Sequence, residues 1–298
     1  MRKVRHRDGR AHFSLLKHFD SSAAHYKTAC EAKEEAPTPA MLLGTCVHAQ
    51  LFGAQKSAML VPWPGKTRSS SAVVDGVKWQ YKAFAKEYTK LAKSKKLSLT
   101  IVSQTVWDRA RRVADAVRAD KVAGPLVFHA GTEHEVPLEW TDPSTGIECA
   151  TRGVDALNRS EAYACEFKTT SNADPAHFAE HAWSMRYHVQ SAMIDEALRT
   201  LGTPVRTHHL IAVEVDEPYA VTVLSHATKL IREPGWDEYD VLERGRRHLR
   251  MWLERLKECE MTDTWPPYQL AAIDWTIPDR IIARMQMSAF TEPDRIAS

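Results

Sequence analysis

The sequence predicts an α/β fold in which a mixed, mainly antiparallel central sheet is flanked by helices. Two observations carry this prediction. Helical spacing of apolar residues gives way at Gly124-Pro125 to short alternating runs of residues that favour strands. Turn sequences then separate these runs at short intervals, which is the pattern of strands joined by hairpins.

The length and composition are those of a globular protein with a sizeable core, because 44% of the 298 residues are hydrophobic and 26% are charged. We expect one domain over residues 1–298. It would consist of a mainly helical part over 1–123, a catalytic sheet and helix over 124–225, and a C-terminal helix and tail over 226–298.

The first part of the chain shows mostly helical spacing. Residues 12–35 predict short helices, and residues 41–52 predict a mostly buried helix that carries one imidazole. The Pro- and Ser-rich stretch 60–71 predicts a loop. Residues 75–95 and 103–120 predict two amphipathic helices. Their polar faces hold basic side chains that are candidates for phosphate contacts, although a solvated helix face is the commoner role: Lys82, Lys86, Lys90, Lys93, Arg109, Arg111, Arg112 and Arg118.

The predicted sheet starts with three strands that are joined by two turns. Residues 135–140 form the first strand, and the turn sequence at 141–146 leads to a second strand over 147–157. A further turn at 158–161 leads to the third strand, residues 162–169.

The rest of the chain alternates between helix and strand. Asp174-Pro175 is a strong helix start, a capping carboxylate followed by proline, and this helix should run to about Arg199. Residues 208–214 and 219–224 predict a second strand pair. Residues 240–260 predict a long charged helix before a tail rich in Trp and Pro.

The charge balance limits the classes of partner. Forty basic and 38 acidic residues give a formal charge of +2, so any contact with nucleic acid must use a local patch. The five cysteines form no CxxC pair and no zinc spacing, which favours the reducing cytoplasm. The basic N-terminus leads into no apolar signal-peptide core, and no apolar stretch approaches membrane-spanning length, so we expect no membrane association.

Three ionisable residues in neighbouring predicted strands suggest a catalytic metal site. Glu166 and Lys168 project from the same face of one strand because side chains alternate. If the two strands pair through an even-membered turn at 158–161, Asp155 of the preceding strand falls on that face too. Two carboxylates and an ammonium around one point can hold Mg²⁺ or Mn²⁺ and offset charge on a phosphoryl group.

At this point the chain resembles a known family. Gly153-Val-Asp155 followed by Glu166-Phe-Lys168 is similar to the PD-(D/E)XK nuclease core, with Gly-Val-Asp where Arg-Pro-Asp is usual. The wider chain, about residues 10 to 280, resembles RecE-type (exonuclease VIII-like) phage recombination exonucleases. Further segments carry this resemblance: Ala24-His-Tyr26, Pro39 to His48, Glu135, Trp140 to Gly146, Asp174-Pro175, Tyr187 to Gln190, and Thr264-Trp-Pro-Pro-Tyr268.

The resemblance implies roles for individual residues. Lys168 would orient or polarise the attacking water and stabilise the transition state. Tyr187 and Gln190, three apart on a helix, would line the site, whereas Ile194 stands where related nucleases often have a tyrosine. The implied metal ligands are His48, Asp155, Glu166 and the backbone carbonyl of Phe167, with Glu135 as an additional candidate. Without the resemblance, His48 would be taken as a core histidine and Glu135 as a surface strand residue.

The resemblance also implies an activity and its setting. The enzyme would degrade one strand of linear double-stranded DNA from the 5′ end and leave a 3′ single strand for a RecT-like annealing protein. Mg²⁺ would be the cofactor, and Mn²⁺ should also support activity because an imidazole ligand suits it. We further expect a homo-oligomer in the cytoplasm of a bacterial host, with a phage or prophage origin.

Two alternatives remain open from the sequence. His177-Phe-Ala-Glu180-His181 fits the H-x-x-E-H pattern of zinc metallopeptidases, although no third ligand is evident downstream. The chain could also be a catalytically inactive DNA-binding relative, against which the intact Asp155, Glu166 and Lys168 argue. Mg²⁺-dependent nucleotide release and zinc-dependent peptide cleavage would separate these readings.

Overall fold

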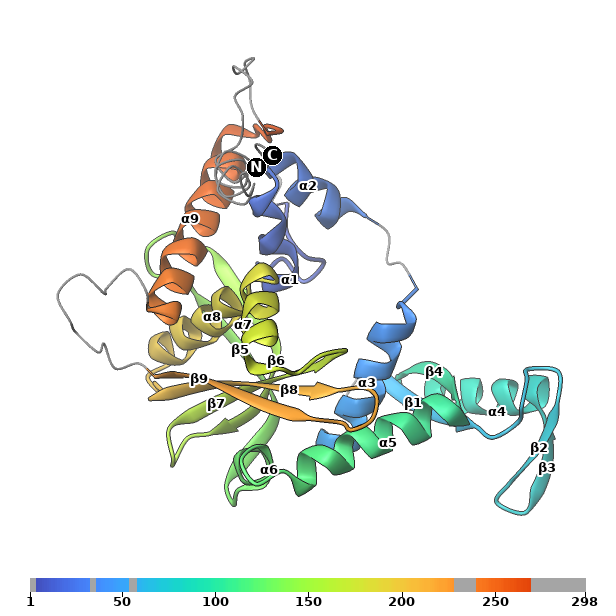
Figure 1. Ribbon diagram of the computed structural model, residues 1–298. Coiled ribbons are helices and arrows are strands. Elements are labelled where there is room, and N and C mark those ends of the chain that lie inside the picture. The colour runs from blue at the N-terminus through green and yellow to red at the C-terminus, as the bar shows by residue number, and fades with distance from the viewer. Residues whose placement is uncertain (1–3, 33–35, 54–57, 228–239, 269–298) are drawn as a thin grey trace, which may run out of the picture.

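The computed structural model describes residues 4–32, 36–53, 58–227 and 240–268. Figure 1 shows a body built around one sheet, with an extension on one side. The helices in chain order are α1 (Phe13–Leu16), the short 3-10 helix η1 (Lys17–Asp20), α2 (Ala23–Glu31), α3 (Pro39–Phe52), α4 (Tyr81–Ser94), α5 (Gln104–Ala119), α6 (Ala123–Phe128), α7 (Pro175–Ser184), α8 (Tyr187–Thr200) and α9 (Val241–Thr262).

The central sheet has five strands in the order β5-β6-β7-β8-β9. β7 and β8 pair in parallel because α7 and α8 connect them, and the other neighbouring pairs are antiparallel. The expected mixed, mainly antiparallel sheet is therefore confirmed. Its strands are β5 (Thr132–Thr141), β6 (Glu148–Asn158), β7 (Tyr163–Thr170), β8 (Thr207–Glu214) and β9 (Val221–Ala227).

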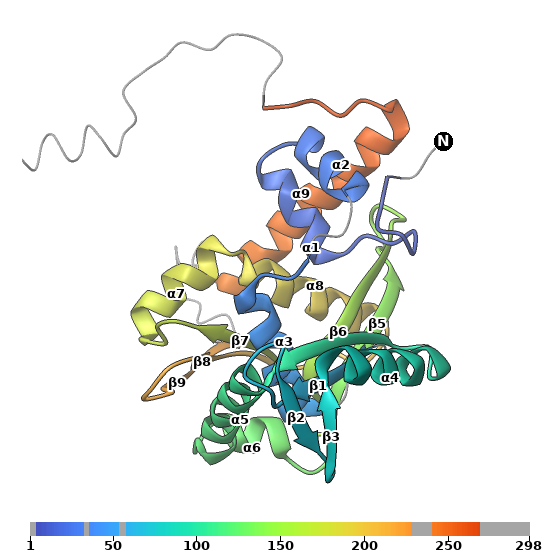
Figure 2. The ribbon, with the colours of Figure 1, turned by 90° about the vertical axis from the view of Figure 1, so that its right-hand side faces the viewer.

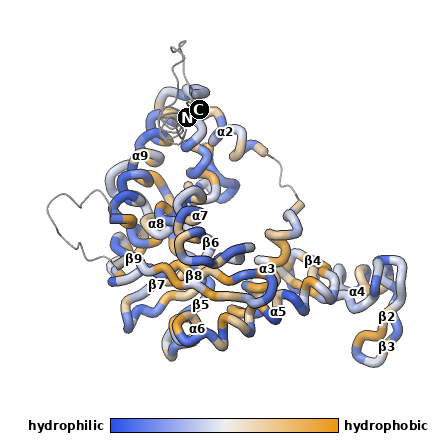
Figure 3. The backbone as a smooth tube through the Cα atoms, in the orientation of Figure 1, coloured by the Kyte–Doolittle hydropathy of each residue, from blue (hydrophilic) through white to orange (hydrophobic). Residues whose placement is uncertain are grey.

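Helices cover both faces of this sheet, and each face has its own hydrophobic core. On one face α8, α9 and the N-terminal helices pack over Leu157 and Ala164. On the other, α3, α5 and α6 pack over Ala156, Cys165 and Phe167. The turned view in Figure 2 shows the two groups of helices on opposite sides of the strands. Figure 3 shows β8 coloured hydrophobic along much of its length, as expected for a strand buried between two layers.

Local signals correctly placed the two hairpins of the central sheet and the start of α7. The Asp142 carboxylate accepts hydrogen bonds from the Thr145 backbone N–H and from the hydroxyl groups of Ser144 and Thr145, which fixes the β5–β6 turn. The Asn158 amide oxygen accepts from the Glu161 N–H in the β6–β7 turn. Asp174 caps α7 by accepting from Ala176 and His177 N–H.

The region predicted as a loop and a helix, residues 60–71 and 75–95, is different. β1 (Ala58–Trp63) pairs in parallel with β4 (Ser98–Ser103), and β2 (Ser71–Val74) forms a hairpin with β3 (Val77–Gln80) before α4 begins. Asp75 and Gly76 both have positive φ, 49° and 79°, so Asp-Gly makes a tight primed turn that the sequence reading overlooked. β1 could not be recognised because its strand partner is 40 residues away.

Two further boundaries were wrong. The predicted change to a strand-type pattern falls at Gly124-Pro125, but these residues lie in α6, and the first strand of the sheet begins at Thr132, three residues before the expected start at Glu135. The single helix expected over 174–199 is two helices, since Arg186 has a left-handed backbone with φ of 62° and its guanidinium pairs with Asp20. The break makes Tyr187 the first residue of α8. The predicted tail beyond Tyr268 lies outside the described residues, and the single-domain division stays a prediction.

Candidate active site

Asp155 and Glu166 lie near each other where the paired part of the β6–β7 hairpin ends. The last pair of the hairpin is Ala156 with Cys165, and Asp155 and Glu166 are the next residue of each strand. Both side chains are about 5% exposed. The strands separate at this point, and the Asp155 carboxylate fills the gap by accepting a 2.6 Å hydrogen bond from the Phe167 N–H through Oδ2.

The second oxygen of Asp155 belongs to a compact group of metal-ligand atoms. His48, on α3, places Nδ1 at 3.5 Å from Asp155 Oδ1 and at 3.2 Å from Glu135 Oε1. The three ligand atoms lie within 4.8 Å of one another. The imidazole is held in place by edge contacts with Phe52 and Phe167, at centroid distances of 5.4 and 5.5 Å. Glu135 and Asp155 lie on the paired strands β5 and β6, which the sequence predicted as a hairpin, whereas only packing of α3 brings His48 to them.

The backbone around Glu135 explains how its carboxylate reaches this group. Glu135 lies in β5 with φ of 52°, next to a register shift between Val136 and Leu138. Gly153 lies beside it, and a Cβ there would be 3.0 Å from the Glu135 carbonyl carbon and 3.1 Å from Oε2. Glycine in the Gly-Val-Asp segment therefore allows the Glu135 backbone to come close.

Glu166 is the centre of a second set of contacts. Its Oε2 accepts hydrogen bonds from Lys168 Nζ at 3.2 Å and from the side-chain amide of Gln190 on α8. The Lys168 ammonium also lies 5.0 Å above the ring of Tyr187. Glu166 Oε1 is buried and has no hydrogen-bond partner among the described residues. A buried carboxylate oxygen without a partner is costly, so this atom indicates a missing ligand.

The charges in the site perturb one another. Burial and the neighbouring Asp155 carboxylate raise the pKa of Glu166 to about 7. Burial alone would lower the pKa of Lys168, but Glu166 and Asp155 outweigh it and raise that pKa. Burial would likewise lower the pKa of His48, but Asp155 and Glu135 raise it overall. Each shift reports excess negative charge, which a divalent cation would relieve.

The residues present fit such a cation. Adjacent ligands of an octahedral ion with bonds of about 2.1 Å lie about 3 Å apart, close to the separations around His48 Nδ1. The Phe167 carbonyl points to the same strand edge as its N–H, toward Asp155, because both groups of one strand residue face the same neighbour. The structure brings His48, Glu135 and Asp155 together as candidate ligands, whereas Glu166 is not part of this cluster; its buried Oε1 and the Phe167 carbonyl are further candidates.

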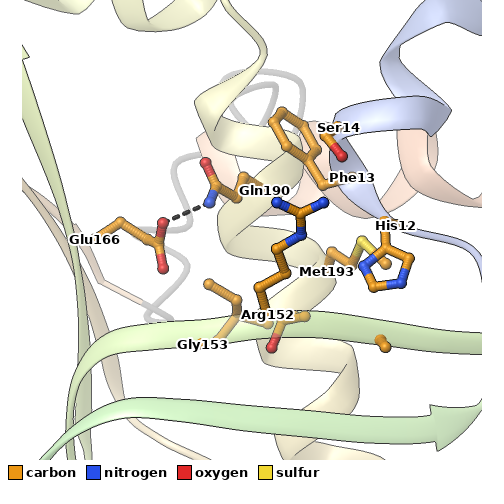
Figure 4. A pocket seen from close by; sticks show the side chains of 11 residues that line it. His12, Phe13, Ser14, Arg152, Gly153, Glu166, Gln190 and Met193 are labelled. Carbon is orange, nitrogen blue, oxygen red and sulfur yellow. Dashed lines mark hydrogen bonds between the residues drawn. The ribbon is translucent and has the colours of Figure 1, made fainter. Parts of the chain in front are cut away.

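Glu166 and Gln190 also border a cavity of about 150 Å³. Figure 4 shows Arg152 of β6 and His12 of the N-terminal segment on the side of this pocket away from Glu166. Ile194, where related enzymes often have a tyrosine, lines the same pocket. The sequence reading did not single out Arg152 or His12, because neither belongs to a motif.

Two other groups of potential metal ligands are weaker candidates for a metal site. His177, Glu180 and His181 are exposed on α7, and no third ligand joins the histidines in any cluster within the described ranges. His6, Asp8 and His12 do lie together. However, the Asp8 carboxylate already bonds both rings, at 3.0 and 2.8 Å. The Arg152 guanidinium, 3.5 Å from His6, disfavours a further cation there.

Comparisons with known proteins support the fold. A crystal structure of a protein designated "Putative exonuclease" from Eubacterium rectale has a TM-score of 0.55, 11% sequence identity, and coverage of 92% of both chains. The crystal structure of SSO0001 aligns with 63% of this chain and 72% of its own chain at 16% sequence identity. Its TM-score of 0.29 is too low to indicate a shared fold. No curated protein matches the sequence.

A family model described as "PDDEXK-like domain of unknown function (DUF3799)" matches residues 12–272. That range includes the whole central sheet and every candidate site residue. The chain therefore belongs to this PDDEXK-like family, and its mixed five-stranded sheet with flanking helices is the fold of the PD-(D/E)XK nuclease superfamily.

Proposed function

We propose that the chain is a metal-dependent exodeoxyribonuclease that hydrolyses phosphodiester bonds of linear double-stranded DNA. One observation carries the proposal: Glu166 Oε1 is buried without a partner, next to a group of His48, Glu135 and Asp155 that has metal-ligand geometry. The adjoining cavity beside Glu166 and Gln190 can admit a small group. A protein that only bound DNA would have no use for this concentration of buried negative charge.

The proposed roles follow from the contacts. Mg²⁺ or Mn²⁺ held by these ligands would activate a water and neutralise phosphoryl oxygens. Lys168 remains a cation at neutral pH because its pKa is raised, so it donates to the attacking water or to a phosphate oxygen and does not act as a base. Gln190 and Tyr187 hold Glu166 and Lys168 in position. Asp155 also fixes the Phe167 backbone.

The finer features rest on the resemblance to RecE-type enzymes. These are 5′ to 3′ polarity, a 3′ single-stranded product for a RecT-like annealing protein, a homo-oligomer, and a phage or prophage origin within a bacterial cytoplasm. None of the described helices is long and apolar enough to span a bilayer.

The test is digestion of 5′- and 3′-end-labelled linear duplexes and of a closed circle in Mg²⁺, with metal omitted as a control. We expect nucleotide release from the linear forms, early loss of the 5′ label, and an intact circle. Asp155→Asn, Glu166→Gln and Lys168→Gln should each lower the rate by about a thousandfold or more while keeping the fold. His48→Ala should raise the metal requirement more than it weakens DNA binding.

Each alternative has its own outcome. Cleavage of the circle would replace the exonuclease with an endonuclease. Duplex binding without cleavage in Mg²⁺ or Mn²⁺ would identify an inactive relative. Zinc-dependent peptide cleavage that is lost in His177→Ala would identify the metallopeptidase.

A further inference from the structure

Residues 58–103 form an arm that projects from the nuclease body (Figure 1). The arm consists of the β1–β4 pair, the β2–β3 hairpin and α4. It has its own small core, in which Val61, Trp63 and Phe84 are buried. The arm is therefore a packed unit and not a loop of the body.

The arm is strongly basic, whereas the rest of the protein is net negative. It contains nine Lys or Arg and two Asp or Glu, whereas the rest of the chain contains 31 basic and 36 acidic residues. All nine basic side chains are exposed. Among the described residues, Lys90 is the one of the nine with a carboxylate within ion-pair distance, Glu87 at 3.8 Å. The nine are Lys66, Arg68, Lys78, Lys82, Lys86, Lys90, Lys93, Lys95 and Lys96.

Four of these lysines form a stripe along α4. Lys82, Lys86, Lys90 and Lys93 follow helical spacing and lie within one quadrant of the helix, opposite the face that buries Phe84. The stripe is about 16 Å long at 1.5 Å per residue. A duplex has one phosphate per 3.4 Å of each strand, so the stripe matches about five consecutive phosphates.

We propose that this lysine stripe binds the phosphate backbone of duplex DNA outside the catalytic site. The inference rests on the proposed function and adds a second contact with the same substrate. The rest of the chain is net negative, and the active site adds buried carboxylates, so affinity for a polyanion needs a separate basic surface. Solvent-exposed charges are screened beyond about 10 Å at 0.1 M salt, which makes local clustering decisive.

The aromatic residues of the arm favour a duplex over a single strand. Trp63, Trp79 and Tyr81 pack around Phe84. No aromatic side chain of the arm is among its large exposed apolar residues. Proteins that bind single strands offer exposed rings for base stacking, whereas the large exposed apolar residues of this arm are aliphatic: Val73, Val77 and Leu91.

The arm is joined to the body next to the site. It follows α3, which carries His48, and it ends at Ser103, whose hydroxyl caps α5 by accepting from the Val106 N–H. α3 and α5 pack in the same core beneath the sheet. DNA bound along α4 would therefore be held by an element continuous with the candidate metal site.

The experiment compares two triple variants of equal charge change. Lys82→Gln/Lys86→Gln/Lys93→Gln removes three stripe charges, and Lys121→Gln/Arg250→Gln/Lys257→Gln removes three exposed charges from the body. Binding of a 30-base-pair duplex is measured in EDTA between 50 and 200 mM salt. Thermal unfolding by circular dichroism confirms that both variants are folded.

The stripe variant should bind at least about tenfold more weakly at 100 mM salt, and its slope of log K against log salt should fall by about 2.7, at 0.9 per phosphate contact. In the body variant the slope should fall by less than half as much as in the stripe variant. An unchanged slope in the stripe variant, or an equal loss in both variants, overturns the proposal. Because binding is measured without metal, failure of the wild type to cleave DNA would count against the proposed function alone.

Discussion

Gly153→Ala tests how the candidate site is assembled. An added Cβ would lie 3.0 Å from the Glu135 carbonyl carbon and 3.1 Å from its Cα, both of them backbone atoms. Ordinary contact starts near 3.4 Å, so β5 must move by about 0.4 Å at this point. Because Glu135 also has φ of 52°, its backbone has little freedom to absorb the shift.

The expected effect is larger on metal binding than on folding. Overpacking of this size costs about 1–3 kcal/mol of folding stability. A metal site tolerates displacement of a ligand by only about 0.5 Å, so a shift of Glu135 should weaken metal binding strongly. We expect Mn²⁺ affinity and cleavage to fall by about tenfold to a hundredfold, the range for a disturbed ligand environment. Glu135→Gln should show a loss of similar size.

Isothermal titration with Mn²⁺ and single-turnover cleavage would measure these effects, alongside unfolding in urea. Gly44→Ala is the matched control, because its Cβ would make only an ordinary 3.5 Å contact with the Thr169 hydroxyl. If Gly153→Ala bound Mn²⁺ and cleaved DNA like the wild type, Glu135 would have no part in the metal site.

Three further predictions concern stability. Gly245→Ala should lower the free energy of unfolding in urea by about 1–3 kcal/mol. The added Cβ would overlap the His188 carbonyl and lie 2.9 Å from Ala192 Cβ, where α9 crosses α8. An unchanged urea midpoint would refute this close crossing. Asp195→Asn should cost about 3 kcal/mol, since it leaves Arg246, 2.8 Å away, without its buried partner, and a loss below about 0.5 kcal/mol would contradict that role. Burial lowers the pKa of His188 to about 4, below its value of 6.5 in the unfolded chain. The unfolded state therefore binds the proton first, and stability should fall as pH drops from 6.5 toward 4; His188→Phe should flatten that pH dependence, and an equally steep curve would exclude His188 as its source.

Much of the core could be predicted because its signals are local. The hairpin turns depend on Asp142 and Asn158, whose side chains bond their own backbone, and the α7 cap depends on Asp174. Alternation along β7 placed Glu166 and Lys168 on one face. The confirmed fold class followed from these elements, and the arrangement of Asp155 beside Glu166 needed only the register of one hairpin.

The remaining features depend on contacts between distant segments, which local patterns do not encode. β1 is a strand because β4 pairs with it, and α7 ends where the Arg186 guanidinium meets Asp20. Only tertiary packing brings His48 from α3 to Asp155, lets Glu135 approach across Gly153, and gathers the lysines of α4 on a separate arm. The sequence by itself determined the β5–β6 and β6–β7 hairpins and the charged groups on β7, because these follow from side-chain alternation and from turn residues that bond their own backbone. The tertiary structure decided which of those groups lie together around His48 and which lie on the separate arm, because both depend on packing between segments far apart in the chain.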